Sequence, residues 1–159
     1  MIVVPLTQGF VTMVDDQDED LVSPFTWHLF PNFQRGFYAV TNRKLSNGRF
    51  TTLRMHRLIL NAEPDQIVDH ANRNGLDNRR RNLRFGNRSL NAANSKHRVD
   101  RRSSPYRGVY KYRDIYKAEI RVNTRLIRLG NFVDPIEAAI AYDVAALGHF
   151  GEFAQCNFR

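Results

Sequence analysis

The feature that most constrains the fold is the last third of the chain, where three β-like runs precede one strongly signalled helix. The runs span 108–112, 116–123 and 125–132. Apolar and polar side chains alternate in the middle run, which is typical of a strand with one face on a core. Asn123 and Thr124 can form the turn that leads into the third run. This order predicts a three-stranded antiparallel sheet packed on one helix, within an α+β fold.

The predicted helix covers 134–150. Asp134 can cap its first turn and Pro135 suits its first position, while Glu137 follows Asp134 at the spacing of a capping box. The larger apolar side chains recur at helical spacing, so we expect them to share one face and to contact the sheet. These side chains are Ile136, Ile140, Val144 and Leu147.

The composition indicates a soluble intracellular protein. The chain has 159 residues, 42% of them hydrophobic, which is enough for one or two small domains. Cys156 is the only cysteine, so we expect no internal disulfide and no structural zinc. No run approaches the roughly 18 apolar residues of a membrane span, and the N-terminus lacks the charged start of a signal peptide. We therefore expect no membrane partner, and a location in the cytoplasm of a bacterial host if a phage encodes the chain.

The charge distribution points to a polyanion as the partner. The net charge is +8 and the pI is near 10.1. Residues 1–50 carry a net charge of −1, residues 51–104 carry +7, and residues 105–159 carry +2. Most basic residues of the middle segment are arginines, whose forked guanidinium suits phosphate. This favours nucleic acid as the partner over a surface that is merely well solvated.

The sequence divides into four parts. Residues 1–50 hold short β-like runs and an Asn47-Gly48 hairpin turn, and we expect a β-rich segment that braces the part after it. Residues 51–95 hold the candidate chemistry. Residues 96–104 are polar and basic and are interpreted as a linker. Residues 105–159 form the predicted sheet and helix.

The second part predicts a strand–loop–strand–helix layout. A short helix is expected around His56, which we interpret as a structural histidine. Strands are expected at 66–70 and 82–85, and a helix follows at 89–94. The residues that can cap this helix are Asn87 and Ser89.

The end of the first strand and the helix after the second strand have the side chains that phosphodiester hydrolysis requires. Water must be deprotonated, the charge of the transition state neutralised and the leaving oxygen stabilised. At the end of a strand, Asp69 can bind one Mg²⁺ while His70 accepts the proton of water. Asn91, in the following helix, is the candidate for a second oxygen ligand.

The stretches "MHRLIL" and "VDHANRNGLDNRRRNLRFGNRSLNAAN" resemble HNH endonucleases of the phage and intron-encoded homing type, which have a ββα-metal fold. The resemblance implies that His70 is the general base and that Asn82 is a structural residue, which holds the loop by hydrogen bonds. It implies that Asp69 and Asn91 are the ligands of one divalent metal, with Mg²⁺ expected and Mn²⁺ as the alternative.

The other polar residues of this loop divide into turn formers and arginines. Asn72, Asn74, Gly75 and Asn78 are interpreted as turn formers. The arginines are expected to contact the DNA backbone. These arginines, with one in the following helix, are Arg79, Arg80, Arg81, Arg84 and Arg88.

From "YRGVYKY" to the C-terminal "NF", the last part resembles the AP2/ERF DNA-binding domain, in which a three-stranded sheet enters the major groove and a helix packs behind it. Tyr116 stands where that family usually has Trp, and Asp114 and Ile115 stand where it has a Gly-Lys pair. The DNA-facing positions that the resemblance implies are Arg107, Arg113, Tyr116, Arg121 and Arg128.

Together these patterns predict a site-selective DNA endonuclease of the homing type, which hydrolyses phosphodiester bonds of double-stranded DNA with one divalent metal. One site per chain predicts a monomer that nicks, with a dimer as the alternative for cutting both strands. A different reading is a non-catalytic DNA-binding regulator of the AP2 type. A third, a ribonuclease or nonspecific toxin nuclease, is disfavoured by the appended DNA-binding part.

Overall fold

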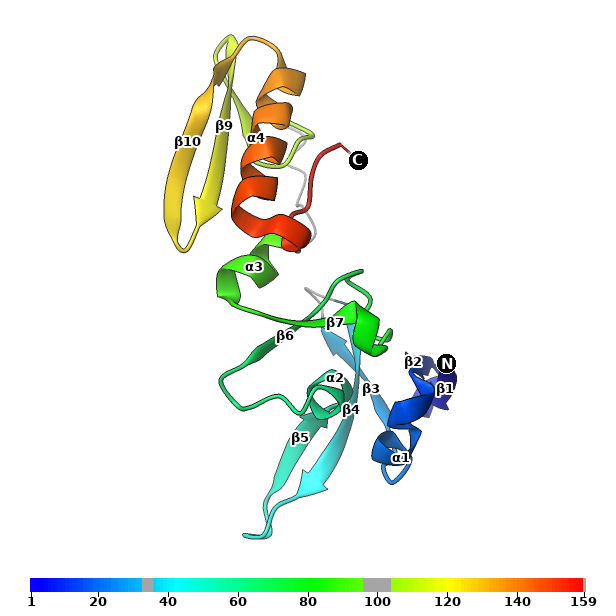
Figure 1. Cartoon of the computed structure of the whole chain (residues 1–159). Coiled ribbons are helices and arrows are strands. Elements are labelled where there is room, and N and C mark those ends of the chain that lie inside the picture. Colours follow the sequence, from blue (N-terminus) through cyan, green and yellow to red (C-terminus); the bar gives the residue numbers. More distant parts are fainter. Residues whose placement is uncertain (33–35, 96–103, 159) are drawn as a thin grey trace. The chain divides into compact units, whose positions relative to one another are not determined.

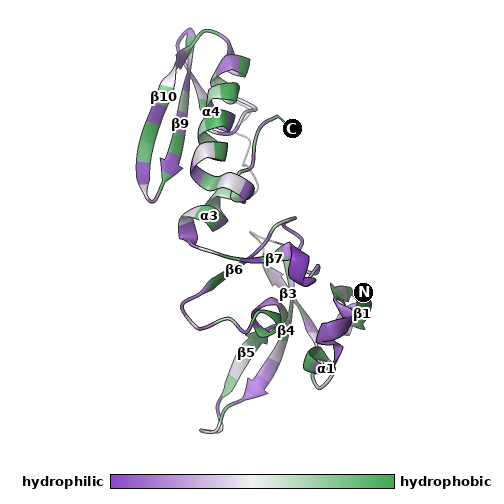
Figure 2. Cartoon of the chain, in the orientation of Figure 1, coloured by the Kyte–Doolittle hydropathy of each residue, from purple (hydrophilic) through white to green (hydrophobic). Residues whose placement is uncertain are grey.

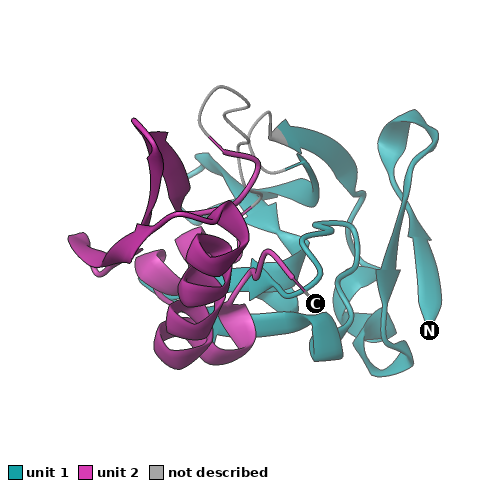
Figure 3. Cartoon of the chain, turned by 90° about the horizontal axis from the view of Figure 1, so that it is seen from above, with its two compact units in different colours: residues 1–86 teal, residues 87–159 magenta. Residues whose placement is uncertain are grey.

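The computed structural model describes residues 1–32, 36–95 and 104–158, and it divides into two compact units. Unit 1 spans 1–86 and unit 2 spans 87–159 (Figure 3). The described residues form an α+β structure with four small antiparallel sheets, which confirms the predicted class. The predicted linker at 96–104 lies outside the described residues except for Ser104.

Unit 1 begins with two antiparallel sheets (Figure 1). The pair β1 and β2 covers Ile2–Pro5 and Val11–Val14. The three-stranded sheet has the order β3-β4-β5, and its strands are His28–Asn32, Gly36–Lys44 and Phe50–Arg54.

The hairpin between β4 and β5 forms at the predicted Asn47-Gly48 turn. Gly48 has a φ of 78°, a left-handed conformation that favours glycine, and its amide donates to Leu45 O. The register pairs Val40 with Arg54 and Lys44 with Phe50. Strand β5 was not predicted, because its sequence "FTTLR" lacks a strict alternation and runs directly into a helix.

Helical turns close the core of unit 1. A 3₁₀ turn at Asp16–Asp18 leads into α1 at Glu19–Val22, and α2 spans Met55–Ile59. Burial of apolar surface here is the main stabilising contribution. The core residues are Leu6, Val14, Val22, Trp27, Ala39, Met55, Ile59 and Leu83.

Strands β6 (Ile67–His70) and β7 (Leu83–Gly86) form the predicted antiparallel pair of the candidate site. A loop and the 3₁₀ turn Arg80–Asn82 connect them. An isolated bridge between Met13 and Asp77 joins this loop to β2. The N-terminal strands therefore contact the loop directly.

Unit 2 has the predicted three-stranded sheet and long helix. The sheet order is β10-β9-β8, with strands Arg125–Phe132, Ile115–Val122 and Val109–Tyr112. Helix α4 spans Pro135–Phe150 and lies against one face of the sheet (Figure 1). The carboxylate of Asp134 accepts from Ile136 N, which confirms Asp134 as the cap, although a capping box would use the amide of Glu137.

The prediction of which face of α4 is buried was wrong. Ile136, Ile140, Val144 and Leu147 are exposed, with Val144 at 67% of its full accessibility. The face on the sheet is made of small residues and two aromatic rings, which lets the helix approach closely. Figure 2 shows hydrophobic residues along much of α4, so periodicity could not distinguish the two faces. The buried residues are Ala138, Ala139, Tyr142, Asp143, Ala146 and Phe150.

Helix α3 (Arg88–Ala93) belongs to unit 2. Asn87 is its cap, since its side-chain oxygen accepts from Leu90 N, and this resolves the choice between Asn87 and Ser89. Leu90 and Ala93 pack with the core around Tyr142 and Phe150.

Among the described residues, no helix is both long and apolar enough to cross a membrane.

Candidate active site

Asp69 and His70 end strand β6, and both are buried. The register places Asp69 opposite Arg84 of β7. The guanidinium of Arg84 donates to Asp69 Oδ2 from Nε at 3.2 Å and from Nη2 at 3.0 Å. These two bonds hold the carboxylate of Asp69 in one orientation through Oδ2.

The imidazole of His70 is held from several sides. Its Nε2 lies 3.2 Å from Asn78 Oδ1. The ring of His56 meets it edge-on at a centroid distance of 4.9 Å, and the ring of Tyr38 lies at 5.8 Å. The orientation of the ring is therefore fixed by packing as well as by a hydrogen bond.

Burial keeps both histidines neutral. It lowers the pKa of His70, although the hydrogen bond to Asn78 and the nearby carboxylate of Asp69 act in the opposite direction. Burial and the neighbouring His70 and Arg54 lower the pKa of His56 to about 3. A neutral His70 at pH 7 can accept a proton.

Asn82 ties the two ends of the loop together. Its Oδ1 accepts from Asn72 N at 2.9 Å, and its Nδ2 donates to Asp77 O at 2.7 Å. Its backbone oxygen accepts from Ala71 N. These bonds are of the kind that the prediction assigned to Asn82.

The predicted turn formers shape the loop as expected, with one exception. The side-chain oxygens of Asn72 and Asn74 each accept from a backbone amide two residues on, which defines successive Asx turns. Gly75 is in tight contact with β4, because a Cβ there would lie 2.2 Å from Phe37 O. Asn78 is different: it is fully buried and contacts His70, so it belongs to the site.

Three of the predicted DNA-contacting arginines form ion pairs within unit 1, and one of them is Arg84, which pairs with Asp69. Arg79 donates to both carboxylate oxygens of Asp77, and this contact lowers the pKa of Asp77. Arg80 binds Asp18 through Nε and Nη2, and its backbone amide donates to Asp15. The acidic segment near the N-terminus thus holds the loop.

Arg81, the next residue of the run, has a different environment. It is exposed and forms no ion pair with any described residue. Of the run at 79–81, it is the residue whose charge faces solvent without a carboxylate partner in the described structure.

Asn91, the predicted second metal ligand, lies on α3 and therefore in unit 2. Arg88, on the same helix, is exposed. Asp69 and His70 lie in unit 1. The role of Asn91 stays a prediction.

The sheet face of unit 2 that is turned away from α4 is basic. Arg121 and Arg128 are exposed on it, Glu119 Oε1 lies 3.7 Å from Arg128 Nε, and Arg113 is in the β8–β9 turn with a φ of 54°. Lys117 Nζ lies 4.1 Å from the centroid of the Tyr112 ring, at cation–π distance. This open sheet face of unit 2 therefore presents several cationic side chains to solvent.

Two predicted DNA-facing residues are placed elsewhere. Tyr116 packs on the α4 side, against the cluster that contains Val109, Ala118 and Ala139. The guanidinium of Arg107 donates to the backbone oxygens of Ala92 and Ser95 and to the hydroxyl of Tyr142. These contacts differ from the predicted ones, because each side chain serves the interior of unit 2.

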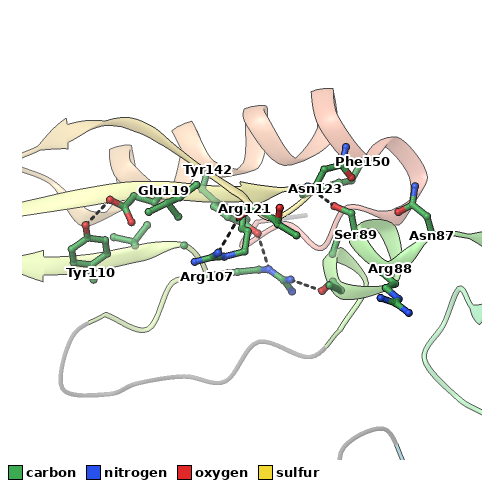
Figure 4. A pocket seen from close by; sticks show the side chains of 16 residues that line it. Asn87, Arg88, Ser89, Arg107, Tyr110, Glu119, Arg121, Asn123, Tyr142 and Phe150 are labelled. Carbon is green, nitrogen blue, oxygen red and sulfur yellow. Dashed lines mark hydrogen bonds between the residues drawn. The ribbon is translucent and has the colours of Figure 1, made fainter.

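A hollow of about 910 Å³ opens between α3 and the sheet within unit 2 (Figure 4). Arg88, Arg107 and Arg121 line it, together with Tyr110 and Glu119, whose side chains are hydrogen bonded to each other at 2.7 Å. Its walls are mixed in charge, and part of the cationic lining is already engaged by backbone oxygens.

Within unit 1, the donor that Asp69 offers is a carboxylate oxygen, which suits a hard divalent cation such as Mg²⁺ rather than a soft one. No group of three or more His, Cys, Asp and Glu side chains able to hold a metal occurs among the residues described. A cation here would keep several waters, as Mg²⁺ commonly does.

Sequence reasoning missed Asn78, Thr12, Tyr38 and the acidic residues that bind the arginines. Asn78 has the appearance of a turn former in the sequence, and Thr12 is 66 residues away from it. The sequence signal for these ion pairs was the presence of an acidic segment near the N-terminus and of an arginine run whose charges could be compensated by it.

A scan against protein-family models and a search of curated proteins find no match to this chain.

Proposed function

We propose that the chain is a metal-dependent endonuclease of the HNH type that cuts double-stranded DNA, with an AP2-like unit that binds the DNA. The observation that carries the proposal is the arrangement at the end of β6. There a neutral, buried histidine with a fixed ring lies next to a carboxylate, in a loop closed by Asn82.

In this proposal His70 is the general base that takes a proton from the attacking water. Its neutral form and its fixed ring support the role, since a base must be deprotonated and aimed at its proton. Asp69 would hold the divalent metal, and Arg84 orients that carboxylate through Oδ2. When bound, the cation would neutralise charge on the phosphate and the leaving oxygen.

The ββα-metal motif and the AP2-like unit are proposed on two grounds. Strands β6 and β7 with their loop support the two-strand part of the ββα-metal motif, and Asn82 holds the loop by hydrogen bonds. In unit 2, a three-stranded sheet with an exposed basic face and a helix behind it supports DNA as the partner. Arg81, Arg113, Arg121 and Arg128 are the side chains we assign to DNA.

The test is incubation of the purified chain with supercoiled plasmid, with Mg²⁺ or with EDTA. We expect conversion to open circles, which requires both the metal and His70, and loss of conversion in His70→Ala. The matched control is Asn72→Ala, which alters the same loop but leaves the proposed base in place. DNA binding by His70→Ala should match that of the unaltered chain.

Two results would contradict the proposal. Cutting that persists in His70→Ala would remove the assigned base. Binding of DNA without cutting of any substrate, in a panel that includes random-sequence libraries, would favour the non-catalytic regulator instead.

A further inference from the structure

We propose that Asn78 is a positioning residue that holds His70 as the tautomer with its proton on Nε2, so that Nδ1 is the nitrogen that accepts a proton. This inference rests on the proposed function for the meaning of Nδ1 as the base. The tautomer itself follows from hydrogen bonds within unit 1 and is measurable without any reaction.

The argument begins at Thr12, whose side chain is fully buried on β2. Its hydroxyl oxygen lies 2.8 Å from Leu76 O. A carbonyl oxygen only accepts, and the other acceptor near the hydroxyl, Met55 Sδ, lies farther away at 4.0 Å, so the hydroxyl donates its single proton to Leu76. The lone pairs of the Thr12 oxygen are then available to accept.

The side-chain amide of Asn78 donates a hydrogen bond to the Thr12 oxygen. Its Nδ2 lies 2.7 Å from Thr12 Oγ1 and 3.4 Å from Gly75 O. The reversed amide would place its oxygen beside Gly75 O, with no proton between the two acceptors, and would compete with Leu76 for the hydroxyl proton. The amide nitrogen therefore faces Thr12, and Oδ1 faces His70.

The last step fixes the histidine. Asn78 Oδ1 is an acceptor and lies 3.2 Å from His70 Nε2. Only a protonated Nε2 can donate to it, and a neutral imidazole has one N–H. The backbone of Asn78 is itself anchored, because its amide donates to Met13 O at 2.8 Å. Strand β2 thus determines which nitrogen of His70 is protonated.

The direct test is a long-range ¹H–¹⁵N correlation spectrum of the full ¹⁵N-labelled chain at pH 8. His70→Gln identifies the His70 signals by their loss. We expect Nε2 to have the shift of a protonated ring nitrogen and Nδ1 that of an unprotonated one. A protonated Nδ1 in the unaltered chain would overturn the proposal.

Variants test the cause. Asn78→Leu keeps a similar volume but removes the acceptor, and it should produce a mixture of tautomers and lower the cutting rate at least tenfold. Thr12→Val removes the donor that orients the amide without touching His70, and it should produce a mixture as well. An unchanged spectrum in both Asn78→Leu and Thr12→Val would show that other contacts set the tautomer.

The readouts separate this inference from the proposed function. A chain that shows the Nε2–H tautomer but never cuts DNA would refute the nuclease and leave the tautomer assignment intact. A chain that cuts DNA with His70 protonated on Nδ1 would do the reverse.

Discussion

At the scale of single residues, the neighbouring arginines Arg80 and Arg81 have different roles. Arg80 compensates the charge of Asp18, which is almost fully buried, whereas Arg81 is exposed. Removing Arg80 leaves a buried carboxylate unpaired, so Arg80→Ala should lower the free energy of unfolding by about 1–3 kcal/mol. Denaturant titration of the full chain measures this.

Arg81→Ala is the matched control for that experiment. It should change the free energy of unfolding by less than about 0.5 kcal/mol. Because its guanidinium is available to phosphate, it should weaken DNA binding and reduce the dependence of the affinity on salt. Equal stability losses in the two variants would contradict the assigned roles.

Because of His56, the free energy of unfolding of unit 1 depends on pH. The unfolded chain binds a proton at His56 near its ordinary pKa of 6.5, whereas the folded chain does so only at a pKa of about 3. The stabilisation that the neutral His56 contributes to the folded chain is therefore complete above pH 6.5, and it is lost as the pH falls through the range between these two pKa values. At pH 4.5 the loss attributable to His56 should be about 2–3 kcal/mol.

His56→Phe keeps a ring in the same place and removes the titrating group. Its free energy of unfolding should fall less between pH 7.5 and pH 4.5 than that of the unaltered chain. Parallel pH profiles of the two proteins would show that His56 does not titrate on unfolding.

Individual site residues could be predicted from the sequence only where spacing or composition singles them out. Asp69, His70 and Asn82 are of this kind, and the structure places all three around one loop. Asn78 was interpreted as a turn former, because nothing local reveals that its amide contacts Thr12 on a distant strand. Ion pairs such as Arg80 with Asp18 depend on tertiary packing in the same way.

At the scale of elements, Arg107 fixes helix α3 in unit 2. Its guanidinium donates to the oxygens of Ala92 and Ser95, at the end of the helix, where backbone oxygens lack partners within it. Arg107→Met should lower the free energy of unfolding of unit 2 by about 1–3 kcal/mol. It should also speed hydrogen exchange at the amide of Asn94, which donates to Leu90 O.

Arg121→Met is the control for Arg107, since Arg121 is exposed on the open face of the sheet. It should leave exchange at Asn94 unchanged and weaken DNA binding. If Arg107→Met instead left exchange unchanged and weakened only DNA binding, Arg107 would be a DNA contact as first predicted.

Helix α4 allows a test of which face is buried. Ala139 is fully buried and Ile140 is half exposed. Ala139→Leu overpacks the interface with the sheet and should cost about 1–3 kcal/mol. Ile140→Lys should change the free energy of unfolding by less than about 0.5 kcal/mol, as thermal unfolding of both variants can show.

The elements themselves were predictable where caps and turns are local. The start of α4, the hairpin at Asn47-Gly48 and the β6–β7 pair follow from short-range chemistry. The buried face of α4 does not, because the sheet selects small residues that let the helix approach. A sum of hydrophobicity along the helix favours the opposite face.

At the scale of the whole molecule, the positive charge is unevenly divided between the two units. Residues 1–86 carry 11 basic and 9 acidic side chains, a net charge of +2. Residues 87–159 carry 13 basic and 7 acidic side chains, a net charge of +6. In unit 1, moreover, Arg79, Arg80 and Arg84 are paired with carboxylates at 2.7–3.0 Å, whereas among the described residues of unit 2 Arg128 makes a longer ion pair with Glu119 at 3.7 Å. Long-range attraction to DNA should therefore come mainly from unit 2.

This division predicts how salt acts on the full chain. Each phosphate contact that is removed lowers the slope of log affinity against log salt by about 0.9. The double variant Arg121→Ala, Arg128→Ala should then lower the slope by about 2 and raise the dissociation constant, measured by fluorescence anisotropy with a labelled duplex. Saturating DNA should restore its cutting rate, because the residues assigned to the chemistry in unit 1 are unaltered. If the slope did not change while cutting at saturation were lost, the exposed sheet face would serve the reaction rather than binding.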